Sequence, residues 1–139
     1  MFYGRIIFVM GNKNDFDLEL FFSALADRTR LRLLNLMRDG EVCVCFFAGT
    51  LETNNPKISR HLSYLKRAGL VEGRRDGKWM HYRIRRPDNP LAGEVFDATM
   101  RLLAADREMS ADLRQYSAFC CSPNAPVTIA GRARQTAEV

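Results

Sequence analysis

The period of the apolar residues changes near residue 70, and this change limits the possible folds more than any other feature. Before residue 70, apolar residues recur at helical spacing. After it, apolar and polar residues alternate in two short runs, one on each side of Asp76-Gly77. Asp-Gly between alternating runs is typical of a β-hairpin turn. We expect Trp79 and Tyr82 to pack this hairpin onto the body of the protein, and His81 to face solvent or phosphate.

Four helices are predicted before the hairpin. Asp15 or Asp17 can cap the first, which should run to about Ala26 with its apolar residues on one stripe. The second should cover residues 29–38, and it is apolar on so much of its girth that it must pack on more than one side. The third should cover residues 42–51. Pro56 suits the first turn of the fourth, which Gly69 should end.

A long helical region is predicted from Asn89-Pro90 onward. It carries two apolar stripes, which imply two packing partners, and in so small a domain the second partner is plausibly another chain. Helical spacing continues toward Phe119. We therefore expect an N-terminal extension over residues 1–14, one domain over residues 15–119, and a flexible tail with a cysteine pair over residues 120–139.

The composition fits a soluble domain with a polyanionic partner. The chain has 139 residues, 47% of them hydrophobic, which suffices for one core. Its formal charge of +5 favours a nucleic acid if the cations cluster. No apolar run is long enough to span a bilayer, and the opening segment lacks the features of a secretory signal, so a cytoplasmic location is expected. Translation from Met1 and from Met10 are both compatible with the sequence.

The order of the predicted elements is that of a winged helix-turn-helix: three helices, a basic-faced helix, a hairpin and then a long helix. The predicted fold class is thus mainly α (α+β), with a two-stranded wing and long N- and C-terminal helices. The fourth helix can lie in the major groove, and the wing can follow the DNA backbone or enter the minor groove. Each charged surface alone is more often a solvated face, and His61 is equally compatible with partial burial. The predicted DNA contacts are Lys57, Ser59, Arg60, His61, Ser63, Tyr64, Arg67, Arg74, Arg75 and Lys78.

Four cysteines form two tight pairs, Cys43/Cys45 and Cys120/Cys121. Closely spaced thiols in a reducing compartment are more often metal-binding or redox-active than structural disulfides, although two buried structural thiols remain the alternative. On a regular helix, residues two apart point about 200° away from each other. The first pair can therefore chelate one ion only if the start of the predicted third helix is unwound. Soft thiolates favour As(III), Sb(III), Cd(II), Pb(II) or Zn(II) over hard cations.

Residues 16–109 resemble the ArsR/SmtB family of metal-responsive repressors. The resemblance lies in "ALADRTRLRLLNLM", "NNPKISRHLSYLKRAGLV" and "RRDGKWMHYRI", while "EVCVCFF" is similar to the family's "ELCVCD" metal box. It implies a homodimer on pseudo-twofold operator DNA, joined through the first and last helices. It also implies repression that a thiophilic metal or metalloid relieves, with no cofactor required.

Departures from the family's patterns narrow the choice of ion that this chain could bind. The third cysteine of the best-known arsenite repressors is Ala48 here, residues 1–20 contain no cysteine, and residues 84–139 contain no histidine. A trigonal thiolate site then needs Cys120 or Cys121, in the same chain or across the dimer. Such a site favours As(III) or Sb(III) as inducer. The alternatives are a Cd/Pb/Zn-responsive repressor and a thiol-redox regulator, whereas a thiol enzyme is disfavoured because no C-x-x-C motif is present.

Overall fold

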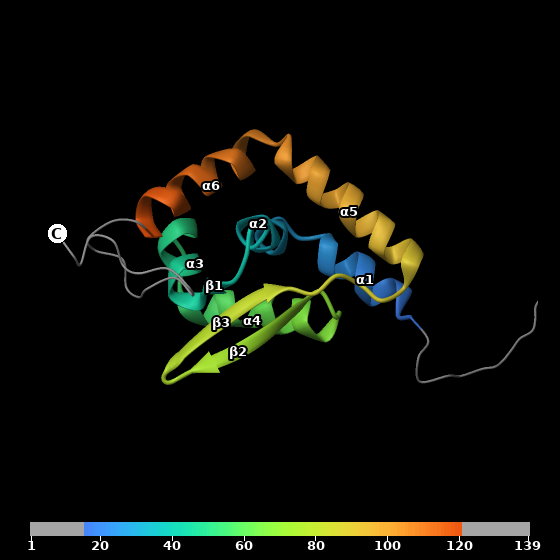
Figure 1. The fold of residues 1–139 in the computed structure, drawn as a ribbon, viewed down its shortest axis with the longest axis horizontal. Coiled ribbons are helices and arrows are strands. Elements are labelled where there is room, and N and C mark those ends of the chain that lie inside the picture. The colour runs from blue at the N-terminus through green and yellow to red at the C-terminus, as the bar shows by residue number, and fades with distance from the viewer. Residues whose placement is uncertain (1–15, 121–139) are drawn as a thin grey trace, which may run out of the picture.

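The computed structural model describes residues 16–120, which form six helices and one small sheet (Figure 1). The predicted extension over residues 1–14 and the tail from Cys121 onward lie outside the described residues. The elements follow in the order α1 (Leu18–Leu25), α2 (Arg28–Leu36), β1 (Val42–Cys43), α3 (Val44–Leu51), α4 (Asn55–Arg67), β2 (Val71–Asp76), β3 (Trp79–Ile84), α5 (Pro90–Ala104) and α6 (Arg107–Cys120).

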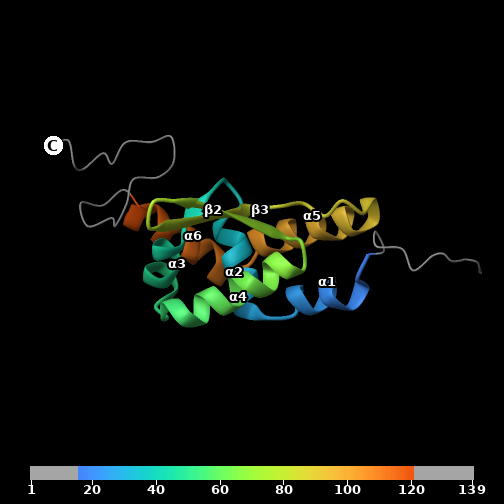
Figure 2. The same ribbon diagram turned by 90° about the horizontal axis from the view of Figure 1, so that it is seen from below.

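Helix α2 lies at the centre of the molecule. Helices α5 and α6 form an arch over one side of it, and α4 lies with the β2–β3 hairpin on the opposite side (Figures 1 and 2). Helix α3 packs against both α4 and α6. The order of elements and their arrangement confirm the predicted winged helix-turn-helix.

Polar side chains fix where the helices begin. Asp17, Asp27, Asn54 and Asn89 each occupy an N-cap position in extended backbone and accept hydrogen bonds from N–H groups of the first turn. Gly69 has a φ of +79° just after α4, a backbone conformation that favours glycine, so it ends the helix as predicted.

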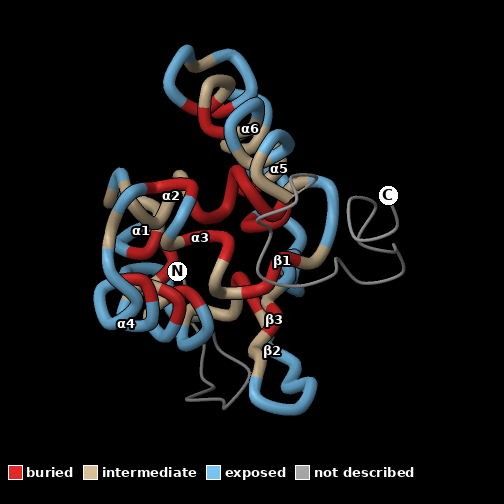
Figure 3. Tube along the Cα trace, turned by 90° about the vertical axis from the view of Figure 1, so that its left-hand side faces the viewer, coloured by how far each residue is buried: buried red, intermediate tan, exposed pale blue. Residues whose placement is uncertain are grey.

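The core gathers around α2 and is nearly closed to solvent (Figure 3). Helix α4 contributes its inward face, and the predicted inward residues Ile58, Leu62 and Leu65 are fully buried. Trp79 and Tyr82 pack against the same core, which confirms the prediction that they hold the wing to the body. The remaining buried core residues are Phe21, Ala24, Leu33, Leu34, Leu36, Met37, Val42, Cys43, Phe46, Phe47, Leu51, Leu70, Val71, Ala92 and Phe96.

Polar groups on α2 connect it to the arch. The Asn35 amide is buried and donates to the carbonyl oxygen of Met109 at 2.9 Å. Arg32 donates to both carboxylate oxygens of Asp112 at 2.7 and 2.8 Å, and Asp112 is only 4% exposed. Buried polar groups need such partners because leaving one unpaired costs free energy.

Two predicted helix boundaries were wrong. Helix α2 ends at Leu36, two residues early, and a turn leads to Gly40. The third helix begins only at Val44, because Val42 and Cys43 are extended and pair with Tyr82 and His81 of β3. The sheet therefore has three strands in the order β1-β3-β2, and the wing hairpin is joined to the segment before α3.

The predicted apolar stripe of α1 is also divided between two environments. Phe21 is buried in the core, whereas Leu18 and Phe22 are 60% and 49% exposed. Helix α5 behaves similarly. Its stripe with Phe96 and Leu103 faces the core, but the other stripe leaves Leu91 and Leu102 each 71% exposed. Both helices thus present apolar side chains that this chain does not cover.

Candidate DNA interface and thiol site

Helix α4 lies on the same side of the molecule as the β2–β3 hairpin (Figure 2), and its polar residues are exposed. Burial of its apolar stripe against α2 and α3 leaves the opposite face outward. The predicted contacts Lys57, Ser59, Arg60, Ser63 and Arg67 are all exposed. An exposed helix with cations at this position in a winged helix-turn-helix has the geometry to enter a major groove.

The hairpin carries three further predicted contacts. Gly77 has a φ of +62° in the two-residue turn that joins Asp76 to its partner Trp79. Arg75 and Lys78 are exposed at this tip, where they can follow a phosphate backbone. Arg74 is exposed too, but its guanidinium forms an ion pair with Glu41.

His61 and Tyr64 lie in a cluster between α4 and the start of α2. Arg30 donates to the carbonyl oxygens of Ala24 and Ser23 at 3.0 and 2.7 Å, which satisfies the C-terminal end of α1. The same guanidinium lies 3.3 Å from His61 Nδ1 and 4.1 Å from the centre of the Tyr64 ring. Arg30 therefore connects α1, α2 and α4, a role that the sequence analysis missed.

The surroundings of His61 favour its neutral form. Its side chain is 18% exposed and lies 3.7 Å from Asp27. Burial lowers the pKa of His61, the Asp27 carboxylate raises it, and the nearby cations Arg30, Lys57 and Arg60 lower it further, with a net decrease. A partly buried, neutral imidazole at this position supports the packing of α4, and a DNA contact by His61 stays a prediction.

The thiols of Cys43 and Cys45 converge where β1 passes into α3. Their sulfur atoms lie 3.0 Å apart, and neither forms a disulfide. Cys43 is the N-cap of α3 in extended backbone, with φ −73° and ψ 140°, and Cys45 lies in the first helical turn. The start of the predicted third helix, Val42 and Cys43, is thus extended and not helical, which is the condition that the sequence set for chelation by this pair. The change from strand to helix already directs both side chains to one point.

The two thiols share a proton unequally. A hydrogen bond from Cys45 lowers the pKa of Cys43 to about 7, with burial acting against it and backbone N–H groups of α3 adding to it. The pKa of Cys45 is raised, chiefly because it donates that hydrogen bond. The pair as a whole holds one thiolate near neutral pH, and a thiolate is the form that binds soft ions.

The predicted third thiolate is only partly described. Cys120 ends α6 and packs against the core beside Phe119, whose ring stacks edge-on with Phe46 of α3 at 5.4 Å. Cys121 lies outside the described residues. Within residues 16–120, no three His, Cys, Asp or Glu side chains are grouped to hold a metal ion. The contribution of Cys120 or Cys121 stays a prediction.

His81 and Glu41 are neighbours of the thiols that the sequence analysis did not place there. His81 is 6% exposed, so the expectation that it faces solvent or phosphate was wrong. It lies opposite Cys43 in the sheet, and its Nδ1 is 4.0 Å from Glu41 Oε1. The sequence offers one signal that could have placed these two residues beside the thiols. The alternation of Glu41, Cys43 and Cys45 is compatible with an extended strand as well as with a helix.

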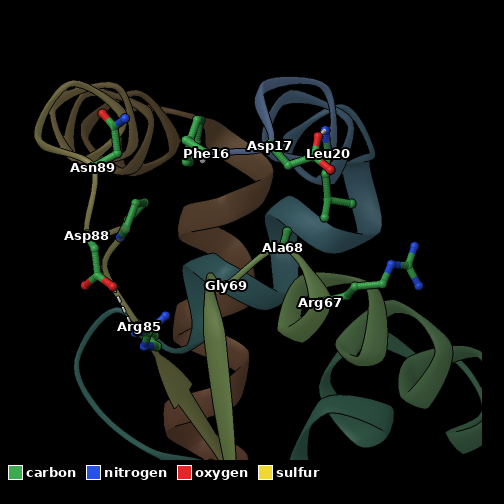
Figure 4. Close-up of a pocket in the computed structure, with 10 residues that line it drawn as sticks. Phe16, Asp17, Leu20, Arg67, Ala68, Gly69, Arg85, Asp88 and Asn89 are labelled. Atoms are coloured by element: carbon green, nitrogen blue, oxygen red, sulfur yellow. Dashed lines mark hydrogen bonds and ion pairs between the residues drawn. The ribbon is translucent and has the colours of Figure 1, made fainter. Parts of the chain in front are cut away.

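A separate hollow of about 830 Å³ lies between the start of α1, the end of α4 and the loop before α5 (Figure 4). Arg67 and Arg85 line it together with Asp17 and Asp88. Arg85 is paired with Asp88 at 3.1 Å, so one of the two cations is already neutralised there. The hollow contains neither thiol of the Cys43/Cys45 pair.

The fold and the exposed cationic helix define a class, the DNA-binding winged helix-turn-helix proteins. Residues 27–73 match the family model described as bacterial regulatory protein, arsR family. An arsenic resistance transcriptional regulator, ArsR1 of Pseudomonas putida, is 38% identical over 80% of this chain and 86% of its own length. The chain belongs to the arsR family.

Two further proteins agree with this assignment. The arsenical resistance operon repressor of Escherichia coli is 42% identical over 58% of this chain and 69% of its own length. The crystal structure of the transcriptional repressor BigR from Xylella fastidiosa matches with a TM-score of 0.53 at 25% identity, over 63% of this chain and 83% of that one. None of the helices in residues 16–120 is long and apolar enough to cross a membrane.

Proposed function

We propose that this protein is a metalloid-responsive repressor, which binds operator DNA as a homodimer and releases it when As(III) or Sb(III) binds its cysteine thiolates. The observation that carries the proposal is the convergence of Cys43 and Cys45 at 3.0 Å, with one thiolate favoured near neutral pH. The arsenic-related names of the relatives support the same inducer class. Cys120 or Cys121 supplies the third sulfur.

The homodimer is part of this proposal because both α1 and α5 expose apolar side chains. Leu18, Phe22, Leu91, Val95 and Leu102 are between 38% and 71% exposed. A second copy that covers them would bury one self-complementary surface, as twofold dimers do. Two copies would also place two α4 helices for a pseudo-twofold operator.

The central experiment measures operator release under a thiol-free reductant. Fluorescence anisotropy of labelled operator DNA is followed as As(III) is added to the wild type and to Cys43→Ser, Cys45→Ser, Cys120→Ser and Cys121→Ser. We expect the first two variants to bind operator normally and to keep it when As(III) is added. If both respond like the wild type to As(III), Sb(III), Cd(II), Pb(II) and Zn(II), the pair is structural and the sensor proposal fails.

The late cysteines are tested in the same assay. If one of them is the third ligand, only Cys120→Ser or only Cys121→Ser should weaken induction sharply, and if they substitute for each other, only the double variant should. X-ray absorption should then report three sulfurs around arsenic in the wild type and two in that variant. Full induction and three-sulfur coordination in the double variant would exclude both.

The DNA-reading face is tested with exposed cations. Arg60→Ala should weaken specific binding by roughly 1–3 kcal/mol if Arg60 contacts a base. Lys78→Ala should weaken all sequences alike and flatten the salt dependence. Lys66→Ala is the matched control, since Lys66 is exposed on α4 but lies outside the predicted contacts. Wild-type affinity of both Arg60→Ala and Lys78→Ala over a range of salt would show that the assigned face is wrong.

A further inference from the structure

We propose that Glu41 is a positioning residue that couples the thiol pair to the DNA-binding wing through Arg74. The inference rests on the proposed function, because it concerns how ligand binding at Cys43 and Cys45 reaches the DNA. Glu41 lies two residues before Cys43, on the loop that leads into β1, whereas Arg74 lies on the outer strand of the wing.

The contact between them has defined geometry. Arg74 Nε donates to Glu41 Oε2 at 2.9 Å, and Arg74 Nη2 donates to Glu41 Oε1 at 2.7 Å. The Glu41 side chain is 17% exposed and the Arg74 side chain 49% exposed. A two-point arginine–carboxylate pair fixes orientation as well as distance, which a single contact does not.

The sheet provides a second connection between the same two places. Cys43 is opposite His81 on β3, and His81 is opposite Arg74 on β2. Residues directly opposite each other in antiparallel strands have side chains on the same face. Cys43, His81 and Arg74 therefore form one row across the sheet, from a buried thiol to an exposed cation of the wing.

Glu41 is connected to both ends of this row, Cys43 and Arg74. It pairs with Arg74, its Oε1 lies 4.0 Å from the buried His81 ring, and its backbone continues directly into the strand that carries Cys43. A ligand that shifts Cys43 when it binds must also move β1, and the Glu41–Arg74 pair transfers that movement to a side chain predicted to contact DNA. Coupling of this kind requires an element that both sites affect, and β1 with its paired wing is such an element.

The experiment compares Glu41→Gln with the matched control Glu72→Gln. Glu72 pairs with Arg83 on the same wing at 2.5 Å, but its strand β2 is separated from β1 by β3. Operator Kd is measured with and without saturating As(III), and arsenic binding is measured separately by mass spectrometry. We expect Glu41→Gln to bind As(III) and metalloid-free operator, while the ratio of the two Kd values falls about tenfold from the wild-type ratio. Glu72→Gln should keep the wild-type ratio.

Each outcome decides a separate point. A wild-type ratio of one means that the proposed function fails, and the coupling with it. A responsive wild type with an equally responsive Glu41→Gln overturns the coupling alone. Loss of arsenic binding in Glu41→Gln also overturns it, since Glu41 would then act at the thiols, and so does an equal loss in Glu72→Gln. If Glu41→Gln does not fold, Arg74→Gln replaces it. Its basal affinity should fall, but its ratio must fall as well if the inference is correct.

Discussion

Replacing Asp112 with alanine tests how the arch of α5 and α6 is held to α2. Asp112 is 4% exposed and accepts two hydrogen bonds from Arg32, whose side chain is 23% exposed. Removing one partner of a buried ion pair costs roughly 3–5 kcal/mol, because the other charge is left without compensation. Arg32 keeps some contact with water and with Glu108 at 3.7 Å, so we expect the low end, about 3 kcal/mol.

This loss should be visible as a change of the melting temperature. For a chain of this length, about 3 kcal/mol corresponds to a decrease of roughly 10 °C. Calorimetry at one fixed protein concentration measures it, since the Tm of an oligomer depends on concentration. The double variant Arg32→Leu/Asp112→Leu should recover much of the loss, because apolar side chains of similar size can replace a buried ion pair.

Asp97→Ala is the matched control. Asp97 pairs with Arg86 in the same two-point geometry, at 2.9 and 3.0 Å, but both side chains are about half exposed. An exposed pair contributes little to stability because solvent screens it, so its loss should shift the Tm far less than the loss of the Arg32–Asp112 pair. If Asp112→Ala proves as mild as Asp97→Ala, burial does not set the strength of the Arg32 pair and the reasoning is refuted.

Three further variants test other parts of the structure. Cys45→Ala removes the hydrogen bond that holds the pKa of Cys43 at about 7, so the pKa of Cys43 should rise. Iodoacetamide alkylation of Cys43, followed by peptide mass spectrometry at a series of pH values, should then show a midpoint at higher pH. An unchanged midpoint would contradict this. Arg30→Lys cannot serve both α1 carbonyls and the Tyr64 ring together, so urea unfolding should show a loss of about 1–2 kcal/mol and operator titration a weaker complex. Leu102→Asp should leave each protomer folded, because Leu102 is 71% exposed, yet abolish the dimer in light scattering at a cost of several kcal/mol; a variant that still dimerises would argue against the α5 interface.

The helices and the hairpin were predictable because their signals are local. The inward residues of α4 recur at helical spacing, Asp17 and Asn89 stand at helix starts, and Asp76-Gly77 marks the hairpin. The turn itself uses Gly77 and Lys78, one residue later than the dipeptide suggests. Each of these features depends on residues only a few positions apart, which a single sequence displays directly.

The thiol site was less predictable because its geometry depends on a distant strand. "VCVCFFAGTL" reads as one helix from its apolar content, and only pairing of β1 with β3, almost 40 residues later, makes Val42 and Cys43 extended. Burial of His81 follows from the same pairing. A strand of two residues has no period of its own, so its existence is decided by tertiary contacts and not by local propensity.

That short strand also changes how induction can work. If both thiols belonged to a regular helix, an ion could bind only by unwinding α3, at the cost of the core contacts of Phe46 and Phe47. Because the sulfurs already converge, an ion can instead tie the end of β1 to the first turn of α3 with those phenyl rings in place. The parts on either side of this junction are the wing, through β3, and α4, through its packing on α3. Under the proposed function, an ion bound there would therefore act on both of the elements predicted to contact DNA.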